Sequence, residues 1–333
     1  MASKWLVTGG AGFIGSNFIR HILANRPGVR VTNLDKLTYA GNRDNLKDFD
    51  ASRHELVVAD ILDREAVVRA MAGAEVVVHF AAETHVDRSL LDAASFVRTD
   101  VEGTFVLLEA ARTAQVRRFI HISTDEVYGS RLEGSYTETD LTQPRNPYAA
   151  SKLGGDRLAF SYHQTHKLPV VIVRPSNNYG PAQHVEKMVP LFTTNALTDR
   201  PLPLYGDGRN VRDWLFVEDN CRAIDLLVDK GVPGEVYNVA GGNERENLEV
   251  TERILDHLGK PRSLIRPTKD RVGHDRRYSL DGSKLRALGF KPEVSFEDGL
   301  KRTVEWYRDN AWWWTKLRGA EFESYYQQQY EKR

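Results

Sequence analysis

The sequence has almost no cysteine, no excess of charge and no long apolar run. Cys221 is the only cysteine among 333 residues, so no internal disulfide can form, which suits a reducing cytoplasm. Lysine plus arginine and aspartate plus glutamate both number 46, so no net charge draws the protein to nucleic acid or to a membrane surface. No run approaches the roughly 18 apolar residues of a membrane span, and the strand-like start after Met1 leaves no room for a signal peptide. We therefore expect a cytoplasmic protein that binds neither nucleic acid nor membrane.

The first half of the chain alternates between strand-like and helix-like segments. Apolar content of 41% is ample for a core, and the length fits one large domain or two fused ones. Such alternation predicts an α/β fold, a Rossmann-like doubly wound parallel sheet with helices on both faces. The expected strands are 5–8, 30–34, 55–59, 75–80, 117–123 and 168–174, and the expected helices are 14–25, 64–72, 93–113 and 148–166.

The composition of the sequence changes after Pro175, where the loop-forming residues Gly, Pro and Asn cluster in 176–181 and 201–208. A further helix (217–229) and a further strand (235–240) are expected to return to the sheet. We therefore predict a first domain of residues 1–175 plus roughly 211–240. A smaller, discontinuous C-terminal lobe takes 176–210 plus 241–320, and a tail takes 321–333. We expect the aromatic run 312–314 to pack this tail region against the body, and 322–333 to be a frayed helix.

A glycine-rich turn follows the first expected strand and opens a helix. Gly9, Gly12 and Gly15 fall three apart, which permits a tight turn and lets the backbone approach a pyrophosphate at the helix N-terminus. Asp35 follows about 20 residues later, as the dinucleotide-binding pattern requires. The alternative is a chance glycine-rich turn with a surface aspartate. In this strand–turn–helix context, the pattern favours a dinucleotide cofactor bound by the first domain.

The end of the second expected strand indicates which dinucleotide. A carboxylate at Asp35 accepts hydrogen bonds from both ribose hydroxyls and repels a 2′-phosphate, which favours NAD over NADP. Lys36 weakens this preference, because a lysine tolerates that phosphate. Asp60 and Ile61 end the third strand, where an adenine ring would lie. Asp60 is alternatively a cap for the helix that begins near Leu62.

A polar cluster follows the fifth expected strand. Thr124, Asp125 and Glu126 bring a hydroxyl and two carboxyls to its carboxyl end, where open α/β sheets bind ligands. Tyr148 and Lys152 lie four residues apart on one helical face. A nearby ammonium lowers the pKa of a phenol, and such a tyrosine can take a proton from an alcohol while hydride leaves for NAD.

The two adjacent acids have a plainer interpretation as a solvated turn or a helix cap. Neighbours in a regular strand point to opposite faces, so only Thr124 and Glu126 would share one. Asp125 and Glu126 reach one substrate only if the chain turns at this point, which the following Tyr128-Gly129 allows but does not establish.

These segments together resemble the extended short-chain dehydrogenase/reductases, and within them the dTDP-glucose 4,6-dehydratases. The resemblance spans nearly the whole chain. The matching segments are 37–42 (LTYAGN), 81–89 (AAETHVDRS), 124–126 (TDE), 176–181 (SNNYGP), 212–214 (RDW) and 273–278 (GHDRRY).

The resemblance implies a role for each residue of the polar cluster. Tyr148 is the base for the sugar 4-hydroxyl, Lys152 holds it and the nicotinamide ribose, and Thr124 bonds the 4-oxygen. Glu126 removes the proton at C5, and Asp125 protonates the leaving 6-hydroxyl. Hydride passes from C4 to NAD and returns to C6. No metal is required.

The same resemblance implies the binding residues. NAD contacts are expected from Gly9, Gly12, Phe13, Ile14, Gly15, Asp35, Lys36, Leu37, Thr38, Asp60, Ile61, Phe80, Ala81, Ala82, Thr99, Tyr148, Lys152 and Asn178. The nucleotide sugar is expected at Thr84, His85, Thr124, Asn177, Lys187, Met188, Pro203, Leu204, Tyr205, Arg212, Asn247, Asp270, Arg271, Val272, Gly273 and His274. For Arg212 the alternative is a salt bridge with Asp213, and for His274 an ordinary loop histidine.

The implied function is NAD-dependent dehydration of a nucleotide hexose, with dTDP-glucose expected and the base left open among thymidine, uridine and cytidine. A sugar-nucleotide 4-epimerase or a UDP-glucuronate decarboxylase would share Tyr148 and Lys152 but needs no Asp125–Glu126 pair. A non-catalytic sensor on the same fold commonly lacks the tyrosine or lysine that this chain keeps. The resemblance also implies a homodimer formed through the helices near 93–113 and 148–166.

Overall fold

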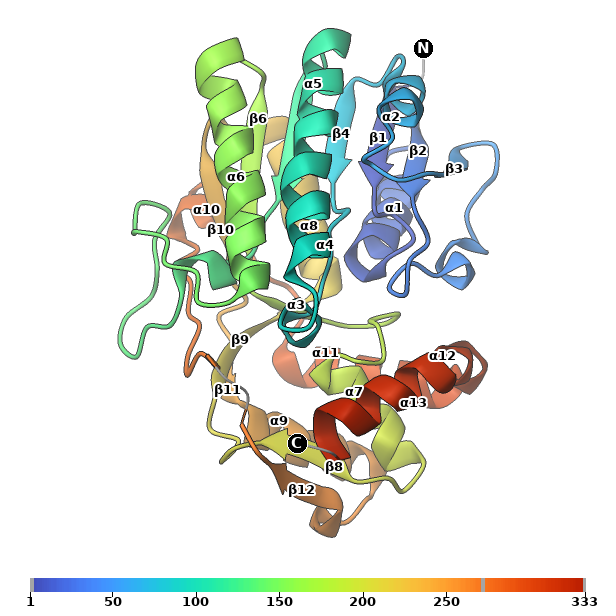
Figure 1. The fold of residues 1–333 in the computed structure, drawn as a ribbon, viewed down its shortest axis with the longest axis vertical. Helices are drawn as coiled ribbons and strands as arrows, with labels where there is room; N and C mark the ends of the chain where they lie inside the picture. The colour runs from blue at the N-terminus through green and yellow to red at the C-terminus, as the bar shows by residue number, and fades with distance from the viewer. Residues whose placement is uncertain (1–2, 271–272, 332–333) are drawn as a thin grey trace.

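The computed structural model describes residues 3–270 and 273–331. Its main feature is a seven-stranded parallel sheet in the order β10-β6-β5-β4-β1-β2-β3 (Figure 1). This confirms the doubly wound fold that the alternating pattern predicts. The strands are β1 (Ser3–Thr8), β2 (Val29–Asp35), β3 (His54–Val58), β4 (Val76–His79), β5 (Arg118–Ile122), β6 (Val170–Pro175) and β10 (Val236–Val239).

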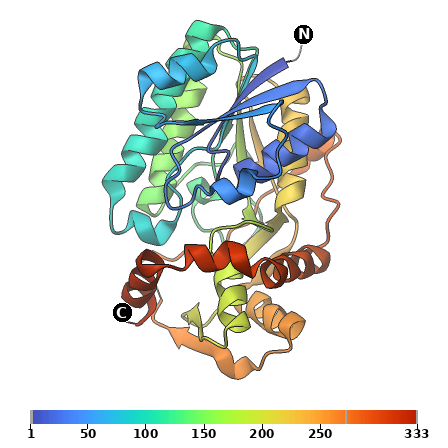
Figure 2. The ribbon, with the colours of Figure 1, turned by 90° about the vertical axis from the view of Figure 1, so that its right-hand side faces the viewer.

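Helices cover both faces of this sheet, as the edge-on view shows (Figure 2). Trp5 and Val7 of β1 pack with α1 (Phe13–Asn25) and α8 (Val217–Lys230) on one face. Leu6, between them, packs on the opposite face with α2 (Arg64–Met71), α5 (Thr104–Ala114) and α6 (Pro147–His166). Alternate residues of a strand point to opposite faces, so a parallel strand buried on both sides is apolar throughout.

The helix expected over 93–113 is built from three pieces. These are α4 (Ala93–Val97), a π-helical turn (Arg98–Gly103) and α5. A π turn adds a residue to the helical repeat and changes which side chains face inward. Here it buries Asp100, which is 2% exposed.

The rest of the chain forms a smaller lobe below the carboxyl ends of the strands (Figure 1). Val211–Phe216, which we expected with the first domain, does not join the large sheet; it pairs with β7 and β11. The domain limits themselves stay a prediction. The lobe contains β7 (Asn177–Tyr179), α7 (Met188–Leu197), β8 (Leu202–Tyr205), β9 (Val211–Phe216), β11 (Glu244–Glu246), α9 (Asn247–Leu258) and β12 (Ile265–Thr268). The short helix α10 (Ser283–Ala287) instead packs beside β10 of the large sheet.

Three C-terminal helices lead the chain back toward the large sheet. They are α11 (Phe296–Asp309), α12 (Ala311–Leu317) and α13 (Ala320–Tyr326), which ends in a π turn (Gln327–Glu331). Trp313 and Trp314 are buried, and Trp313 Nε1 donates to Asn45 Oδ1 at 2.8 Å, which confirms that the aromatic run packs this region against the body. The helix expected over 322–333 is present as far as Glu331, and Phe322, Tyr325 and Tyr326 on it are buried.

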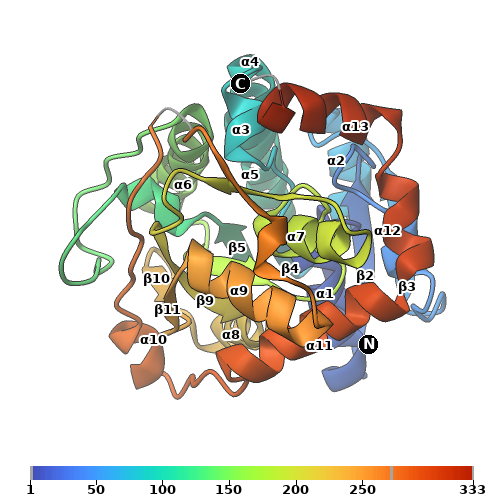
Figure 3. The ribbon, with the colours of Figure 1, turned by 90° about the horizontal axis from the view of Figure 1, so that it is seen from below.

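Seen from below, α13 lies beside the short helix α3 (Val86–Ser89) (Figure 3). The rings of His85 and Tyr325 meet there at 5.8 Å. Within the described part of the chain, no helix combines the length and apolar character that crossing a bilayer requires.

A buried ion pair joins α6 to β6. Arg174 Nε donates to Asp156 Oδ2 at 2.8 Å, and the two residues are 1% and 0% exposed. The Arg174 guanidinium also lies 4.8 Å from the ring centre of Tyr128. This pair therefore connects the sheet to the turn that follows β5.

We expect Asp156→Asn to lower the free energy of unfolding by about 3–5 kcal/mol, because it leaves the buried Arg174 without a counter-charge. Urea unfolding measures the change. The matched control is Arg157→Gln, since Arg157 pairs with the same carboxylate but is half-exposed; it should cost less than about 1 kcal/mol. Equal losses in the two variants would contradict the argument.

Candidate active site

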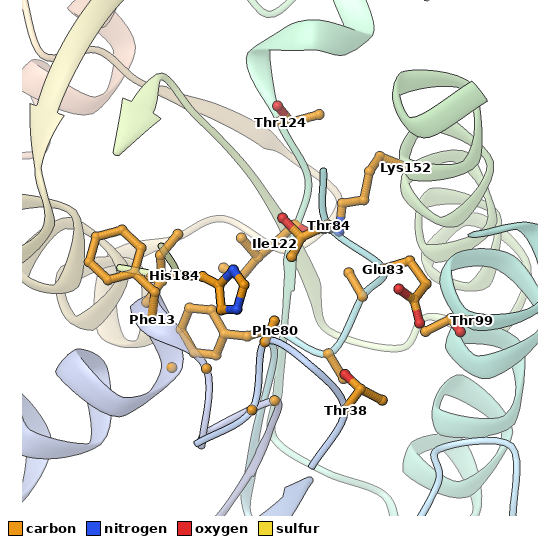
Figure 4. Close-up of a pocket in the computed structure, with 18 of the residues that line it drawn as sticks. Phe13, Thr38, Phe80, Glu83, Thr84, Thr99, Ile122, Thr124, Lys152 and His184 are labelled. Atoms are coloured by element: carbon orange, nitrogen blue, oxygen red, sulfur yellow. Dashed lines mark hydrogen bonds between the residues drawn. The ribbon is translucent and has the colours of Figure 1, made fainter. Parts of the chain in front are cut away.

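A cavity of about 290 Å³ opens at the carboxyl ends of β1, β2, β4, β5 and β6. Parallel strands bring their ends to one edge of a sheet, where open α/β folds bind ligands. Figure 4 shows Phe13 and Phe80 on one side of this cavity, with Lys152 and Thr99 reaching in from helices on the other.

The glycine-rich turn forms the cavity floor and has no room for side chains. Gly9 has φ +71°, and a Cβ added to it would lie 2.6 Å from the Ala81 nitrogen. A Cβ on Gly15 would lie 2.3 Å from the Gly9 oxygen. The start of α1, from Gly12 to Gly15, lines the cavity, and the free N–H groups of a helix N-terminus suit a diphosphate.

Asp35 braces this turn from the end of β2. Its carboxylate accepts from Ala11 N at 2.9 Å and from Leu37 N at 2.7 Å. Burial raises the pKa of Asp35, and these two hydrogen bonds oppose the shift. The glycine turn, the lining Asp35 and the apolar Phe80 side chain together fit the dinucleotide that the sequence predicts.

Lys36 and Asp60 pair with each other at 2.6 Å. Asp60 Oδ1 also accepts from Leu62 N at 3.0 Å, but the cap of α2 is Asp63, which accepts from Ala66 N. The alternative prediction that Asp60 caps this helix is therefore wrong, because the cap is Asp63. Both side chains line the cavity, and the Lys36 ammonium pairs there with the Asp60 carboxylate.

Nearly all residues predicted to contact NAD line this one cavity. The exception is Leu37, whose amide serves Asp35 instead. Several lining residues were not predicted, among them Gln183 and His184. Those that the structure brings together are Gly9, Gly12, Phe13, Ile14, Gly15, Asp35, Lys36, Thr38, Asp60, Ile61, Phe80, Ala81, Ala82, Thr99, Tyr148, Lys152 and Asn178.

The chain turns sharply after β5. A 3₁₀ helix spans Asp125–Tyr128, and the hydroxyl of Thr124 caps it by accepting from Glu126 N at 3.3 Å. Gly129 then takes φ +82°, where a Cβ would lie 2.6 Å from the Gln143 oxygen. Because of this turn, Asp125 and Glu126 both line the cavity, which the strand pattern alone left open.

Asp125 is 3% exposed. Burial raises its pKa well above the usual range, and the neighbouring Glu126 carboxylate raises it further. Such surroundings favour the protonated form of the carboxyl, which is the form that can serve as an acid.

Tyr148 lies at the start of α6 within hydrogen-bonding reach of Thr124. Burial raises the pKa of Tyr148 well above its usual value, and the Glu126 carboxylate raises it further. Lys152 donates to the Ile122 carbonyl at 2.6 Å, and burial lowers the pKa of this ammonium. The expected lowering of the Tyr148 pKa is therefore wrong for this geometry, because burial and the nearby carboxylates raise it.

Asp100 is a residue that the sequence reasoning missed. Its carboxylate accepts from Ser151 Oγ at 2.6 Å and from Glu83 N at 2.9 Å. Burial raises its pKa to about 6, against the opposing effect of Lys152. The only signal in the sequence is an acid inside an otherwise amphipathic helical segment, and the π turn decides that it faces inward.

A second cavity of about 160 Å³ adjoins the first, and Glu126, Asn177 and Lys187 line both. Of the predicted sugar-nucleotide residues, Thr84 and Thr124 line the first cavity. Asp270 bonds His274 at 2.6 Å without lining either cavity, and neither cavity includes Gly273. Arg271 and Val272 lie outside the described residues. The second cavity contains His85, Asn177, Lys187, Met188, Pro203, Leu204, Tyr205, Arg212, Asn247 and His274.

Arg212 does not form the local pair with Asp213 that the sequence allowed. It donates to the Asp275 carbonyl at 2.9 Å, and its guanidinium lies 4.3 Å from the ring centre of Tyr278. Asp213 instead accepts from the backbone of Gly241 and Asn243. This leaves the planar cation in the wall of the second cavity, where it suits an anionic ligand.

The fold and the site define the class: a short-chain dehydrogenase/reductase with a dinucleotide pocket, a Tyr-x-x-x-Lys pair and an adjoining second cavity lined by Arg212. A sequence profile of the family described as GDP-mannose 4,6 dehydratase matches residues 6–303. The chain is 53% identical over 322 residues to a dTDP-glucose 4,6-dehydratase of Streptomyces niveus, covering 95% of this chain and 96% of the relative. It is 44% identical to dTDP-glucose 4,6-dehydratase 1 of Escherichia coli, covering 99% of both.

Solved structures agree with these relatives. The dehydratase DesIV of Streptomyces venezuelae, crystallised with NAD and TYD bound, superposes with a TM-score of 0.93 at 53% identity, covering 94% of this chain and 99% of that one. The UDP-glucose 4-epimerase of Thermus thermophilus, in complex with NAD, gives 0.86 at 33% identity, with 92% and 99% covered. The chain belongs to the nucleotide-sugar 4,6-dehydratase family, in the branch of the dTDP-glucose 4,6-dehydratases.

The glycine turn generates a direct test of the dinucleotide site. We expect Gly15→Ala to weaken NAD binding on the order of tenfold or more, since its Cβ would collide with backbone in the turn. Isothermal titration calorimetry with NAD measures this. Gly28→Ala is the matched control, because a Cβ there meets nothing within 4 Å. Wild-type affinity in Gly15→Ala would contradict the assignment of the turn.

Proposed function

We propose that this protein converts dTDP-glucose into dTDP-4-keto-6-deoxyglucose and water, with NAD as a cofactor that is regenerated in each turnover. The observation that carries the proposal is the 3₁₀ turn that aims two adjacent acids, Asp125 and Glu126, into the cavity that Tyr148 and Lys152 also line. An epimerase or a decarboxylase needs the tyrosine and lysine but not this pair. The protein is a hydro-lyase in this proposal.

NAD bound over the glycine turn would take a hydride from sugar C4 and return it to C6. The residues that hold it are the backbone of Gly9–Gly15, Asp35 at the ribose and Lys152 beside Tyr148. Asp35 is already fixed by two backbone donors, so its free lone pairs are oriented before the ribose arrives. Orientation of this kind lowers the entropic cost of binding.

Tyr148 accepts the proton of the 4-hydroxyl through its phenol oxygen, and Thr124 bonds the same sugar oxygen. In the absence of substrate the phenol holds its proton firmly, because burial and Glu126 raise its pKa. A positive charge brought close by the bound cofactor favours phenolate. Oxidation at C4 therefore depends on the cofactor being bound in the site.

Glu126 removes the proton at C5 once C4 carries a ketone, because the ketone acidifies the neighbouring C–H bond. Asp125 supplies the proton that lets the 6-hydroxyl leave as water. The two acids need opposite starting states, and burial favours the protonated form of Asp125. Two neighbouring carboxyls in different surroundings divide acid and base roles in this way.

The second cavity receives the nucleotide diphosphate in this proposal. Arg212 bonds phosphate oxygens, and the base lies against Tyr205 and His274, whose rings meet edge to face at 5.9 Å. The protein acts in the cytoplasm as a homodimer whose contact includes α5 and α6. Leu91 and Val97, 56% and 55% exposed near these helices, extend that contact, and sedimentation equilibrium measures it.

Products formed from dTDP-glucose test the reaction. Mass spectrometry should show loss of one water and no net accumulation of NADH. An unchanged mass would indicate an epimerase, and loss of carbon dioxide from UDP-glucuronate would indicate a decarboxylase. Parallel reactions with UDP-glucose and CDP-glucose should be slower, and binding of all three without turnover would revive the non-catalytic sensor.

Glu126→Gln should stop dehydration, lowering turnover by roughly 100-fold or more, while C4 oxidation continues and NADH builds up. Removing this negative charge also lowers the pKa of Tyr148, since Glu126 raises it. The rate of NADH formation should therefore reach its alkaline plateau at a lower pH than in wild type. Stopped-flow absorbance across pH measures both effects.

Glu102→Gln is the control for this prediction, because Glu102 is an exposed acid on the π turn. Its turnover and pH profile should match those of wild type. Full turnover in Glu126→Gln would show that another group removes the C5 proton.

A further inference from the structure

The segment Gly273-His274-Asp275-Arg276-Arg277-Tyr278 matches the family, yet the mechanism above uses little of it. Its two middle arginines form ion pairs, the exposed Arg276 with Asp207 at 2.8 Å and the largely buried Arg277 with Glu244 at 2.7 Å. Asp275 and Tyr278 face inward and are 1% and 2% exposed. The two arginines therefore fix the segment through ion pairs, whereas Asp275 and Tyr278 have no assigned role.

Tyr278 directly contacts Glu126, the proposed base. The Tyr278 hydroxyl lies 2.6 Å from Asp275 Oδ2 and 3.3 Å from Glu126 Oε2. The same Glu126 oxygen accepts from Asn146 Nδ2 at 3.3 Å. Tyr278 and Glu126 both line the second cavity, so this contact lies at the edge of the substrate site.

Two cationic side chains hold the pair in this arrangement. Arg145 Nη1 lies 3.1 Å from Asp275 Oδ1. Arg212 stacks on the Tyr278 ring and donates to the Asp275 carbonyl. Burial raises the pKa of Tyr278 well above its usual range, so the phenol keeps its proton at neutral pH.

A phenol has one proton to donate and lone pairs to accept with. The short 2.6 Å contact assigns that proton to the Asp275 carboxylate, since charge-assisted hydrogen bonds are the shorter and stronger ones. The Tyr278 oxygen then presents a lone pair to Glu126. An ionised Glu126 gains nothing from that lone pair, whereas a protonated Glu126 can donate to it.

We propose that Tyr278, held by Asp275, is a positioning residue for C5 deprotonation: it accepts a hydrogen bond from Glu126 once Glu126 has taken the C5 proton. Atoms balance, because the proton moves from C5 to Glu126 and the Tyr278–Asp275 bond is unchanged. Asn146 donates a hydrogen bond to the ionised form of Glu126, and Tyr278 accepts one from the protonated form. This inference rests on the proposed function.

Tyr278→Phe removes only the hydroxyl oxygen. We expect kcat to fall roughly 10- to 100-fold, as for loss of one hydrogen bond to a reacting group, with the KM for dTDP-glucose within about threefold. C4 oxidation does not use this bond, so NADH should accumulate during turnover. Exchange of the C5 hydrogen with deuterated solvent, followed by NMR, should slow by the same factor as kcat.

A merely structural role for Tyr278 would not slow C5 exchange selectively. The matched control is Tyr162→Phe, since Tyr162 is another buried phenol that donates to a carboxylate, Glu109, at 2.6 Å outside both cavities. It should leave kcat and C5 exchange unchanged.

Asp275→Asn is the second variant and provides the test if Tyr278→Phe does not fold. It keeps an acceptor for Tyr278 but loses the charge that orients the phenol, so the same selective loss is expected.

The proposal is overturned if Tyr278→Phe has wild-type kcat and C5 exchange, or if its C4 oxidation slows as much as its dehydration. Wild-type protein run in parallel separates this failure from failure of the proposed function. If wild type releases no water from dTDP-glucose, both fail; if wild type dehydrates and the variant equals it, only the role of Tyr278 fails.

Discussion

The tight turn that begins at Asp125 is the constraint on which the site depends. Its geometry is set from within the core rather than by a ligand: Tyr128 donates to Asn238 at 2.8 Å, and the buried Arg174 guanidinium covers the Tyr128 ring. A turn anchored in this way holds both acids in place before substrate arrives. Preorganised groups act without reorganising at the moment of reaction, which is the usual source of catalytic power.

Burial then differentiates the groups that the turn brings together. It raises the pKa of Asp125 and Tyr148 and lowers that of Lys152, so each group shifts toward its neutral form. Burial therefore disfavours the ionised form of each of these groups, and nearby carboxylates and ammonium groups determine which residue ionises first. An acid and a base made from adjacent carboxyls become possible because one of them is more deeply buried than the other.

The two cavities share Glu126, Asn177 and Lys187, so the sugar would sit where the dinucleotide and nucleotide sites meet. The lobe that builds the second cavity also brings Tyr278 against Glu126. In the proposed reaction, substrate recognition and proton transfer are thus connected through one packed wall. The close superposition with an epimerase shows that the same scaffold accommodates a different reaction.

The sequence by itself determined the sheet, the glycine turn, Asp35 and the spacing of Tyr148 and Lys152, because these follow from local periodicity and from residues that are neighbours in the chain. Only the tertiary structure decided that Asp100 faces inward, that Lys152 bonds the Ile122 carbonyl, and that Tyr278 touches Glu126 across 152 residues. Those contacts join segments that no local pattern relates. The pKa shifts could not be predicted from the sequence either, because the surroundings of a charged group form only when distant segments pack together.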